Sequence, residues 1–277
     1  MKKIISLLLV IAMLATICCA CGKEETETKK LIVATSTGFE PFEMVDNGKY
    51  SGIDLEIAAG LAEYLGYELE IQDMQFESVV TSVQQGLCNI GMAGLTITPA
   101  RQEVVTFSDS YYSANQVLVV PADNTEFDGC KTAEDVVAIL NAKNADCKIG
   151  CQKGTTGSIY ITGDAEDPDG YGFAGLPVTK MEYDYAALAF TAMANKQIDY
   201  VIVDNAPANA IAKSFEGKVK VIDIALSEEA YAFCVGKADA DLLAKVNEYL
   251  AKIKADGTFD KICNNYFGDG TPAEIEG

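Results

Sequence analysis

The sequence predicts an α/β protein built of two lobes. Apolar, strand-like runs alternate with amphipathic, helix-like segments along the chain, a pattern typical of parallel sheets covered by helices. The alternation restarts after the run "VLVVPADN" at residues 117–124, and this break near residue 121 divides the pattern into two parts. A chain of 277 residues is long enough for two ordinary domains.

The first part of the pattern begins with a strand in "KKLIVATS", followed by the loop "TSTGFEPFE". Asp54 is the expected N-cap of a helix that Gly66 ends. A strand at 67–74, a helix at 76–85 and a strand at 89–93 follow. Thr98 is the expected N-cap of the next helix, because Pro99 suits the first helical position.

The second part repeats the alternation, and its expected elements are a helix at 131–145, a strand at 148–152, a helix at 185–195 and a strand at 198–205. We expect a second crossing between the two parts near 220–229. After it come a strand at 231–236, a long amphipathic helix that Asp239 caps and Gly257 ends, and a short helix at 259–268.

Residues 1–20 have the layout of an export signal, a basic start followed by an apolar run at 4–17 and then small residues and cysteines. The run is shorter than the about 20 apolar residues that a membrane span needs. The ending "ICCACG" resembles the lipoprotein signal of bacteria, in which the lipidated cysteine follows a small residue. Cys21 fits that rule best, and an ordinary cleaved signal is the alternative. Residues 21–30 are expected to form a flexible tether.

Composition and charge exclude several functions. The chain has no histidine, so histidine-based catalytic triads and histidine-zinc sites are absent. Its formal net charge of −20 argues against binding of nucleic acid, which rewards basic patches. No cofactor and no metal ion are expected.

Six cysteines follow Cys21, and their spacing fits no metal site. Cys147 and Cys151 lie four residues apart in an expected strand, which is too far for a disulfide. A bridge between Cys130 and Cys147 is compatible with export, and the sequence does not decide it.

Candidate ligand-binding residues lie in loops after the expected strands, where ligands of parallel sheets collect. The loop "AGLTITPAR" carries Ala93, Gly94, Thr96 and Arg101. A cation gains nothing from the positive end of a helix dipole, so an anion bound by both would explain the position of Arg101. Its guanidinium offers a fork for a carboxylate. The alternative is a surface arginine that follows a turn.

A second loop, "KGTTG", includes Lys153, Thr155 and Thr156. Its glycines permit a nest of backbone N–H groups at a helix start, although the spacing of a phosphate-binding loop is absent. A tight turn without a ligand is the alternative. Phe39 and Phe76 offer an apolar clamp, or else plug the core.

Asp204 ends an expected strand, where it would either cap the next helix or meet a ligand ammonium group. One loop thus offers a cation with N–H donors, and another offers an acid. Together they fit a zwitterion, the α-amino and α-carboxylate groups of an amino acid.

The sequence resembles the extracellular solute-binding proteins of the polar amino acid class of ABC importers, from about Leu31 to Gly268. The motifs that carry the resemblance are "GFEPFE", "GIDLEIAAGLAEYLG", "GMAGLTITPARQEVVTFSDSYY", "QKGTTGS", "IDYVIVDNAPA" and "ADGTFDKICNNYFG". It implies a two-lobed periplasmic-binding-protein-like fold (type II) that closes on its ligand like a hinge. Lobe 1 would be discontinuous, at 30–119 and 225–270, and lobe 2 would span 120–224.

The resemblance also implies roles for single residues. Arg101 would bind the ligand α-carboxylate with the backbone of Thr156, and Asp204 would hold the ammonium group with Gly94 and Thr96. The full set of expected ligand-binding residues is Ser36, Phe39, Phe76, Ala93, Gly94, Thr96, Arg101, Lys153, Thr155, Thr156 and Asp204.

Two departures from the family favour a neutral polar amino acid, such as glutamine or cystine, over a basic one. Ser36 stands where binders of basic amino acids often carry an acid, although Glu40 and Glu43 are close in sequence. Ala93 and Gly94 replace the serine pair of histidine and lysine binders.

The expected protein is therefore a monomeric lipoprotein on the extracellular face of a bacterial membrane. It would deliver its amino acid to a membrane permease. The alternative is an enzyme on the same scaffold, a cyclohexadienyl dehydratase that acts on prephenate-like acids with Lys153, Glu40 or Asp204 as acid or base.

Overall fold

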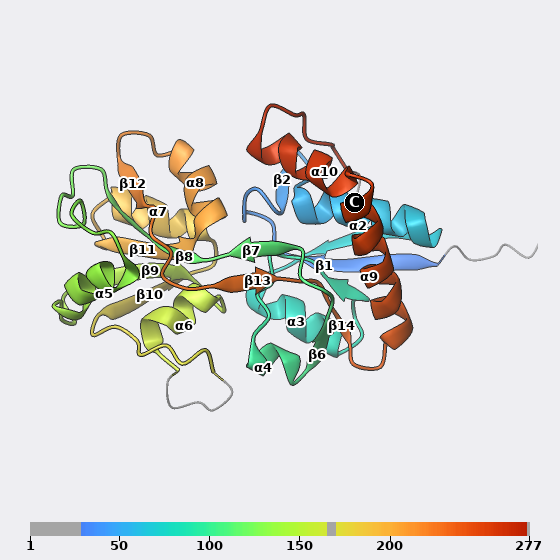
Figure 1. Ribbon diagram of the computed structural model, residues 1–277, viewed down its shortest axis with the longest axis horizontal. Helices are drawn as coiled ribbons and strands as arrows, with labels where there is room; N and C mark the ends of the chain where they lie inside the picture. The colour runs from blue at the N-terminus through green and yellow to red at the C-terminus, as the bar shows by residue number, and fades with distance from the viewer. Residues whose placement is uncertain (1–28, 165–169, 276–277) are drawn as a thin grey trace, which may run out of the picture.

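Two five-stranded sheets and the helices that cover them form the framework of the protein (Figure 1). The computed structural model describes residues 29–164 and 170–275. The expected export signal at 1–20, the lipidation site Cys21 and all but the last two residues of the tether lie outside the described residues.

The first sheet has the strand order β4 (Glu68–Asp73), β1 (Lys30–Thr35), β5 (Ile90–Gly91), β14 (Cys234–Gly236) and β6 (Val105–Phe107). β1 pairs in parallel with β4 and β5, whereas β14 is antiparallel to both of its neighbours. The second sheet has the order β10 (Thr179–Tyr183), β9 (Lys148–Gln152), β11 (Tyr200–Asp204), β8 (Gln116–Pro121) and β12 (Val219–Ile222). Here β8 is the antiparallel strand.

The expectation of purely parallel sheets is therefore wrong for β8 and β14. Parallel neighbours need a crossover, usually a helix, between them. β8 and β14 instead follow directly after the strands that join the lobes, and each is antiparallel to its two neighbours in the sheet. The second sheet also begins at residue 116, a few residues before the expected start of lobe 2 at 120.

Helices cover both faces of the first sheet. α2 (Ile53–Leu65) packs on one face, with α9 (Ala240–Ala255) and α10 (Thr258–Phe267) against it, and α3 (Phe76–Gln84) packs on the other. The alternation along β1 explains this arrangement, because successive side chains of a strand point to opposite faces. Leu31 and Val33 join the core beneath α2, whereas Ala34 joins the core beneath α3.

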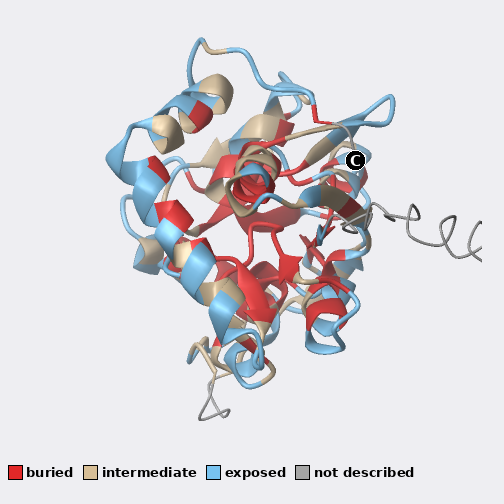
Figure 2. Cartoon of the chain, turned by 90° about the vertical axis from the view of Figure 1, so that its right-hand side faces the viewer, coloured by how far each residue is buried: buried red, intermediate tan, exposed pale blue. Residues whose placement is uncertain are grey.

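The second sheet is covered in the same way. α7 (Ala186–Ala194) and α8 (Asn205–Lys213) lie on one face, and α5 (Ala133–Asn141) and α6 (Thr156–Thr162) lie on the other. Along β11, Val201 and Val203 face α7 and α8, and Ile202 faces the opposite side. Figure 2 shows the buried residues gathered on the strands and on the inner faces of the helices.

Two short antiparallel strands join the lobes. β7 (Tyr112–Ala114) and β13 (Glu229–Tyr231) run side by side between the two sheets in Figure 1, and Tyr112 is paired with Tyr231. The ring of Phe42, just before the hairpin of β2 (Met44–Asp46) and β3 (Lys49–Ser51), meets Tyr231 edge-on at 5.1 Å between centroids. Aromatic packing of this kind gives the connection a firm core.

Several element ends agree with the sequence prediction. α4 (Pro99–Gln102) begins after Thr98, whose hydroxyl accepts a hydrogen bond from the backbone N–H of Arg101. Gly66 ends α2 in the left-handed conformation. Asp54, however, is not the N-cap of α2: Gly52 holds that position, and Asp54 is buried in the first turn. The strand expected at 231–236 is divided between β13 and β14.

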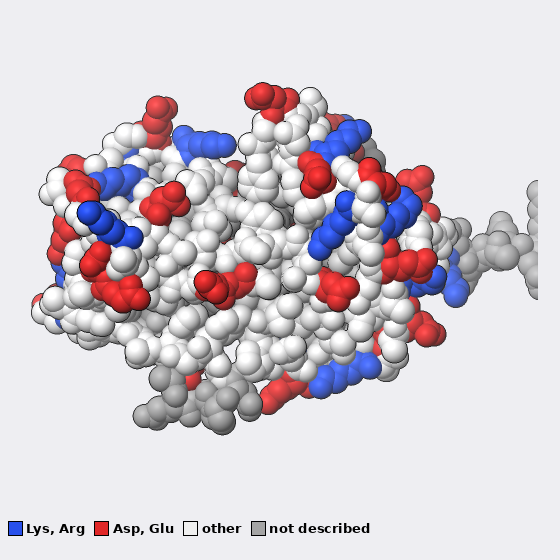
Figure 3. Space-filling view, viewed as in Figure 1, with Lys and Arg blue, Asp and Glu red and all other residues white. Residues whose placement is uncertain are grey.

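Residues 29–164 and 170–275 contain no helix that is both long and apolar enough to cross a membrane. The six cysteines after Cys21 are all free, so the bridge between Cys130 and Cys147 that the sequence left open is not formed. On the face in Figure 3, acidic and basic side chains are scattered over both lobes and leave much of the middle uncharged.

Candidate functional site

Arg101 lies where the two lobes face each other. It belongs to the first turn of α4, and its guanidinium donates one hydrogen bond to the carbonyl oxygen of Thr96, at 2.7 Å. A second bond of 3.0 Å reaches the carbonyl oxygen of Gly154 in the opposite lobe. The guanidinium also stands 5.2 Å above the ring of Phe76. Groups from both lobes therefore hold the Arg101 guanidinium in position.

Gly94 is positioned by a buried carboxylate. Its backbone N–H donates to Asp54 Oδ2 at 2.9 Å, and the Tyr111 hydroxyl donates to Asp54 Oδ1 at 2.5 Å. Burial raises the pKa of Asp54 to about 7, although both hydrogen bonds act to lower it. Gly94 has a φ of 53°, and a Cβ there would lie 2.9 Å from the ring of Phe39. Phe39 therefore covers this turn closely, as only glycine permits.

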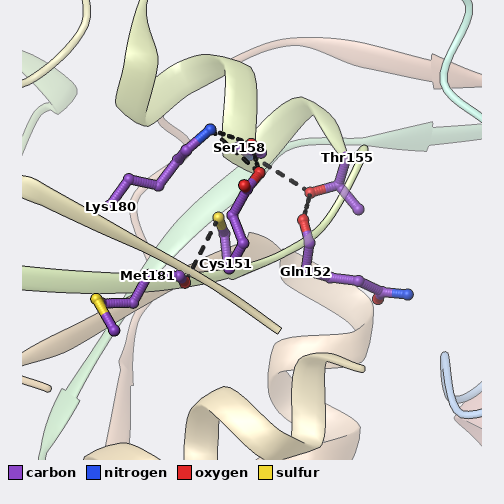
Figure 4. A network of polar contacts seen from close by, with 7 residues as sticks. Cys151, Gln152, Thr155, Ser158, Lys180 and Met181 are labelled. Atoms are coloured by element: carbon purple, nitrogen blue, oxygen red, sulfur yellow. Dashed lines mark hydrogen bonds and ion pairs between the residues drawn. The ribbon is translucent and has the colours of Figure 1, made fainter. Parts of the chain in front are cut away.

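The loop at the start of α6 uses its two threonines differently. The Thr155 hydroxyl donates to the Gln152 carbonyl oxygen at 2.8 Å and caps the helix by accepting from the N–H of Ser158. Figure 4 shows this network, with the Gln152 side chain directed away from it. The Thr156 hydroxyl instead donates to Glu229 Oε2 at 2.6 Å. Thr155 therefore stabilises the loop itself, whereas Thr156 binds Glu229 on the joining strand β13.

Lys153 lies apart from this group. Its ammonium pairs with the Asp184 carboxylate at 2.7 Å, and both side chains are about half exposed (45% and 50%). An exposed ion pair of this kind contributes little energy. Of the residues singled out in the sequence, Lys153 is the one that the structure leaves on the surface beside the site.

Asp204 ends β11 as a buried acid (3% exposed). It occupies the N-cap position of α8 but makes no capping hydrogen bond with its side chain. Its Oδ1 accepts from the Tyr231 hydroxyl at 2.6 Å. Burial and the nearby Glu229 raise the pKa of Asp204 to about 7, while hydrogen bonds from Tyr231 and Gln116 oppose the rise. A cation placed beside Asp204 would therefore favour its charged form.

Seven buried side-chain oxygens have no hydrogen-bond partner within the described chain. They are Thr35 Oγ1, Ser36 Oγ, both carboxylate oxygens of Glu43, Gln116 Oε1, Gln152 Oε1 and Asn205 Oδ1. Thr35, Gln152 and Asn205 stand at or just after the carboxyl ends of β1, β9 and β11. Since unpaired polar atoms are costly in a protein interior, those at the strand ends are candidates for contact with a ligand that offers hydrogen-bond donors.

Glu43 is the strongest member of this group. It is fully buried (0% exposed), and burial raises the pKa of its carboxyl well above the usual range. Asp54, Asp73 and Asp204 raise it further, so the carboxyl lies within electrostatic reach of the acid at the end of β11 in the other lobe. An acid kept without a partner among other acids has one natural complement, a cation.

The structure thus brings Arg101, Thr96, Gly94, Phe39, Phe76, Thr156 and Asp204 to the junction of the lobes. Ala93 is buried beside Gly94, and Ser36 is buried with its hydroxyl unpaired. The described residues hold no cluster of acids and cysteines that could bind a metal ion. The Arg101 guanidinium and the N–H groups at the start of α6 can bind the carboxylate of a zwitterion, and the buried acids can bind its ammonium group.

Sequence reasoning missed Glu229, Gln116, Gln152 and Asn205, and it noted Glu43 only as a neighbour of the first loop. Glu229 lies in an acidic stretch, "SEE", that reads as an exposed turn. No local pattern separates such an acid from a solvated one. The signal is tertiary, since the partners of Glu229 are 2 to 133 residues away in the chain.

The fold and this junction define a class, the two-lobed binding proteins that hold a small ligand between two α/β lobes. The sequence matches the family of bacterial extracellular solute-binding proteins, family 3, over residues 31–269. The chain therefore belongs to this family.

Three relatives illustrate the similarity. The chain is 30% identical over 272 residues to the arginine-binding extracellular protein ArtP of Bacillus subtilis, covering 96% of this chain and 98% of that protein. A solved ancestral arginine-binding protein bound to arginine is 34% identical, with a TM-score of 0.71 and coverage of 86% and 98%. An ancestral amino acid-binding protein described as a precursor of cyclohexadienyl dehydratase is 32% identical, with a TM-score of 0.72 and coverage of 86% and 95%.

Proposed function

We propose that this protein is the ligand receptor of an amino acid ABC importer, and that its ligand is an amino acid with a cationic side chain, arginine before others. The observation that carries the choice of ligand is the buried Glu43 carboxyl, with both oxygens unpaired. The arginine-binding relatives support the same choice.

The α-carboxylate of the ligand would meet Arg101 and the N–H of Thr156, the first residue of α6. The ammonium group would meet Asp204, with the backbone of Gly94 and Thr96 beside it. Phe39 and Phe76 would flank the aliphatic part of the side chain. Burial of a fork-to-carboxylate pair between the lobes gives strong, directional binding.

The far end of the ligand would meet the unpaired oxygens. All seven can accept hydrogen bonds, and the three amide oxygens among them cannot donate. A guanidinium carries five N–H donors in a fixed fork, whereas a glutamine amide carries two. The sequence favoured a neutral ligand because Ser36 is not an acid and because Ala93 and Gly94 replace a serine pair. Glu43 supplies an acid from the same loop, and for this reason we prefer the basic ligand.

Binding would be coupled to closure of the lobes at 30–119 with 225–270 and at 120–224. Arg101 belongs to one lobe, and Thr156 and Asp204 belong to the other. A ligand that contacts both lobes only in the closed arrangement shifts the equilibrium toward it.

A thermal-shift panel with ligand-stripped protein that starts after Cys21 tests this function. A ligand at 100 times its dissociation constant adds about 2.7 kcal/mol of stability, which is a shift of several degrees. We expect stabilisation by arginine, a smaller effect from lysine, ornithine or glutamine, and none with Arg101→Ala. Stabilisation by cystine or glutamine in preference to arginine would contradict the ligand assignment.

Glu43→Gln tests the choice of a cationic ligand separately from the binding of amino acids in general. The amide keeps the size of the side chain but removes the acid, so it should weaken arginine binding at least tenfold while leaving glutamine binding within about threefold. Equal losses for both ligands would place Glu43 outside the side-chain site. Lys153→Ala, which removes only an exposed cation, is the matched control and should change neither affinity.

We also propose that Cys21 carries a lipid that anchors the receptor on the extracellular side of the cytoplasmic membrane, where a monomer delivers its ligand to a permease. The layout of residues 1–21 supports this. Cys21→Ser should release the protein into the medium or periplasm and abolish labelling with a fatty acid, as fractionation would reveal.

We propose that the protein binds its ligand without chemical turnover. An intact set of groups for a zwitterion, with Arg101 for the α-carboxylate and Asp204 for the α-ammonium group, supports binding rather than dehydration of a prephenate-like acid. Incubation with prephenate should yield no product; measurable release of carbon dioxide and water-elimination product would overturn this part.

A further inference from the structure

Glu229 has a position that the proposed ligand contacts do not use. It lies on β13, one of the two strands that join the lobes, and it is buried (6% exposed). Its Oε2 accepts from the Thr96 hydroxyl at 2.7 Å and from the Thr156 hydroxyl at 2.6 Å. Its Oε1 accepts from Gln116 Nε2 at 3.1 Å and from the Ser227 hydroxyl at 2.7 Å.

The two partners of Oε2 come from different lobes. Thr96 follows β5 of the first sheet and precedes α4, and Thr156 opens α6 on the second sheet. Gln116 and Ser227 lie beside the joining strands themselves. One carboxylate oxygen on the connection is therefore held by a hydroxyl from each lobe.

We propose that Glu229 is a positioning residue for ligand capture, a clasp between the lobes that favours the closed arrangement and fixes Thr96 and Thr156. The clasp rests on the proposed function only for the identity of the ligand. Both oxygens of Glu229 are fully engaged with the protein, so it acts through the two threonines rather than by touching the ligand.

The path from Glu229 to the ligand site is short. Thr96 gives its hydroxyl to Glu229 and its carbonyl oxygen to Arg101, so fixing Thr96 also orients the guanidinium. Thr156 gives its hydroxyl to Glu229 and also accepts from Gln116 Nε2 at 3.0 Å, which fixes the first N–H groups of α6.

Opening of the lobes must break the clasp. Two hydroxyls that both lie within 2.7 Å of one oxygen cannot stay there when the lobes that carry them separate. Hydrogen bonds to a carboxylate are shorter and about twice as strong as neutral ones. The ligand-free protein therefore has a built-in preference for closure, and the ligand adds to it.

The test compares Glu229→Leu with Ser227→Ala in two measurements. Ser227→Ala is the control, because it removes a bond of the same length to the same carboxylate without removing either threonine hydroxyl. It also removes the bond that the Ser227 hydroxyl accepts from the backbone N–H of Gln116 at 2.9 Å. Small-angle scattering of ligand-free protein reports closure without any ligand. Titration calorimetry with arginine reports the affinity.

We expect Glu229→Leu to increase the radius of gyration of the ligand-free protein and to weaken arginine binding about tenfold or more. Glu229→Gln should restore much of the affinity, because its amide oxygen still accepts from both threonines. Ser227→Ala should match the wild type in both. Equal behaviour of Glu229→Leu and Ser227→Ala would overturn the clasp.

If Glu229→Leu does not fold, Thr156→Val decides, since it removes one hydroxyl and keeps the shape of the side chain and its N–H. It should open the ligand-free protein, and unchanged scattering would count against the clasp. If the wild type binds none of the tested amino acids, the proposed function fails, and the scattering of ligand-free variants still tests Glu229.

Discussion

At the scale of single residues, the site depends on groups that the fold forces into unfavourable surroundings. Gly94 has a left-handed backbone beneath Phe39, and three acids, Glu43, Asp54 and Asp204, are buried. Each is a cost to the ligand-free protein, and a cationic group of the ligand would relieve it at Glu43 and Asp204. Two predictions follow from these residues.

Gly94→Ala should lower both stability and ligand affinity. The left-handed backbone costs an L-residue about 1–2 kcal/mol, and the new methyl group would displace the ring of Phe39 that it meets at 2.9 Å. Gly86→Ala is the control, because Gly86 has a φ of 71° but open space around its Cβ position. It should lose similar stability and keep its affinity. Equal affinity losses in the two variants would refute the role of Phe39.

The contribution of Asp204 to the stability of the ligand-free protein should fall as the pH rises from about 4 to 7. The pKa of Asp204 is raised from 3.8 to about 7, so in that window the folded state holds a proton that the unfolded state has released. Asp54 acts in the same direction.

Melting temperatures of wild type and Asp204→Asn at pH 5 and pH 8 check this sign. The wild type should lose stability relative to the variant on going to pH 8, because the asparagine does not titrate. A wild type that gains stability relative to Asp204→Asn at high pH would show that the carboxylate is stabilised by a partner already present.

At the scale of helices and strands, residues that are neighbours in the chain determine where several elements of the site begin and end. α4 has only four residues, and its start is determined by Thr98 and Pro99, which the sequence predicts. The strand β9 and the left-handed end of α2 at Gly66 are equally local. Such ends could be predicted because the residues that determine them are neighbours in the chain.

Features set by distant partners could not be predicted. Aspartate is common at the N-caps of helices, but the Asp54 carboxylate is bound instead by Gly94 and Tyr111, 40 and 57 residues away. β8 and β14 run antiparallel to their neighbours because the chain enters each sheet there from the other lobe, and no local sequence pattern shows this. Arg101, Thr156 and Asp204 could be singled out as candidates because loops after strands are where parallel sheets bind ligands, whereas Glu229 lies on a joining strand.

Thr98→Ala should weaken ligand binding through α4. Loss of the cap costs about 1 kcal/mol, and because the first turn carries Arg101, a loss of that size would lower the affinity about fivefold. Thr132→Ala is the control, since Thr132 caps α5 in the same way but carries no residue of the site. It should lower the melting temperature alone. An unchanged affinity for Thr98→Ala would mean that Phe76 and Thr96 hold Arg101 without the cap.

At the scale of the whole molecule, contacts at separate points hold the lobes together. Arg101 reaches Gly154, Gln75 Nε2 donates to the Tyr185 hydroxyl at 3.2 Å, and the Tyr171 hydroxyl donates to the carbonyl oxygen of Ile97 at 2.5 Å. With the bonds of Glu229 on the connection, these contacts belong to the closed arrangement. Contacts made only after closure govern how long a ligand stays rather than how fast it arrives.

Tyr171→Phe tests this separation of rates. The variant keeps the ring, which stacks on Phe173 at 5.2 Å, and removes only the hydroxyl that crosses to Ile97. Loss of one neutral hydrogen bond, about 1 kcal/mol, should raise the dissociation rate of the ligand about fivefold and leave the association rate unchanged. Stopped-flow or surface-binding kinetics with arginine give both rates. Tyr160→Phe, whose hydroxyl lies within lobe 2, should change neither. If Tyr171→Phe slows association instead, the bond to Ile97 forms before the ligand is enclosed, and the lobes close by a different order of steps.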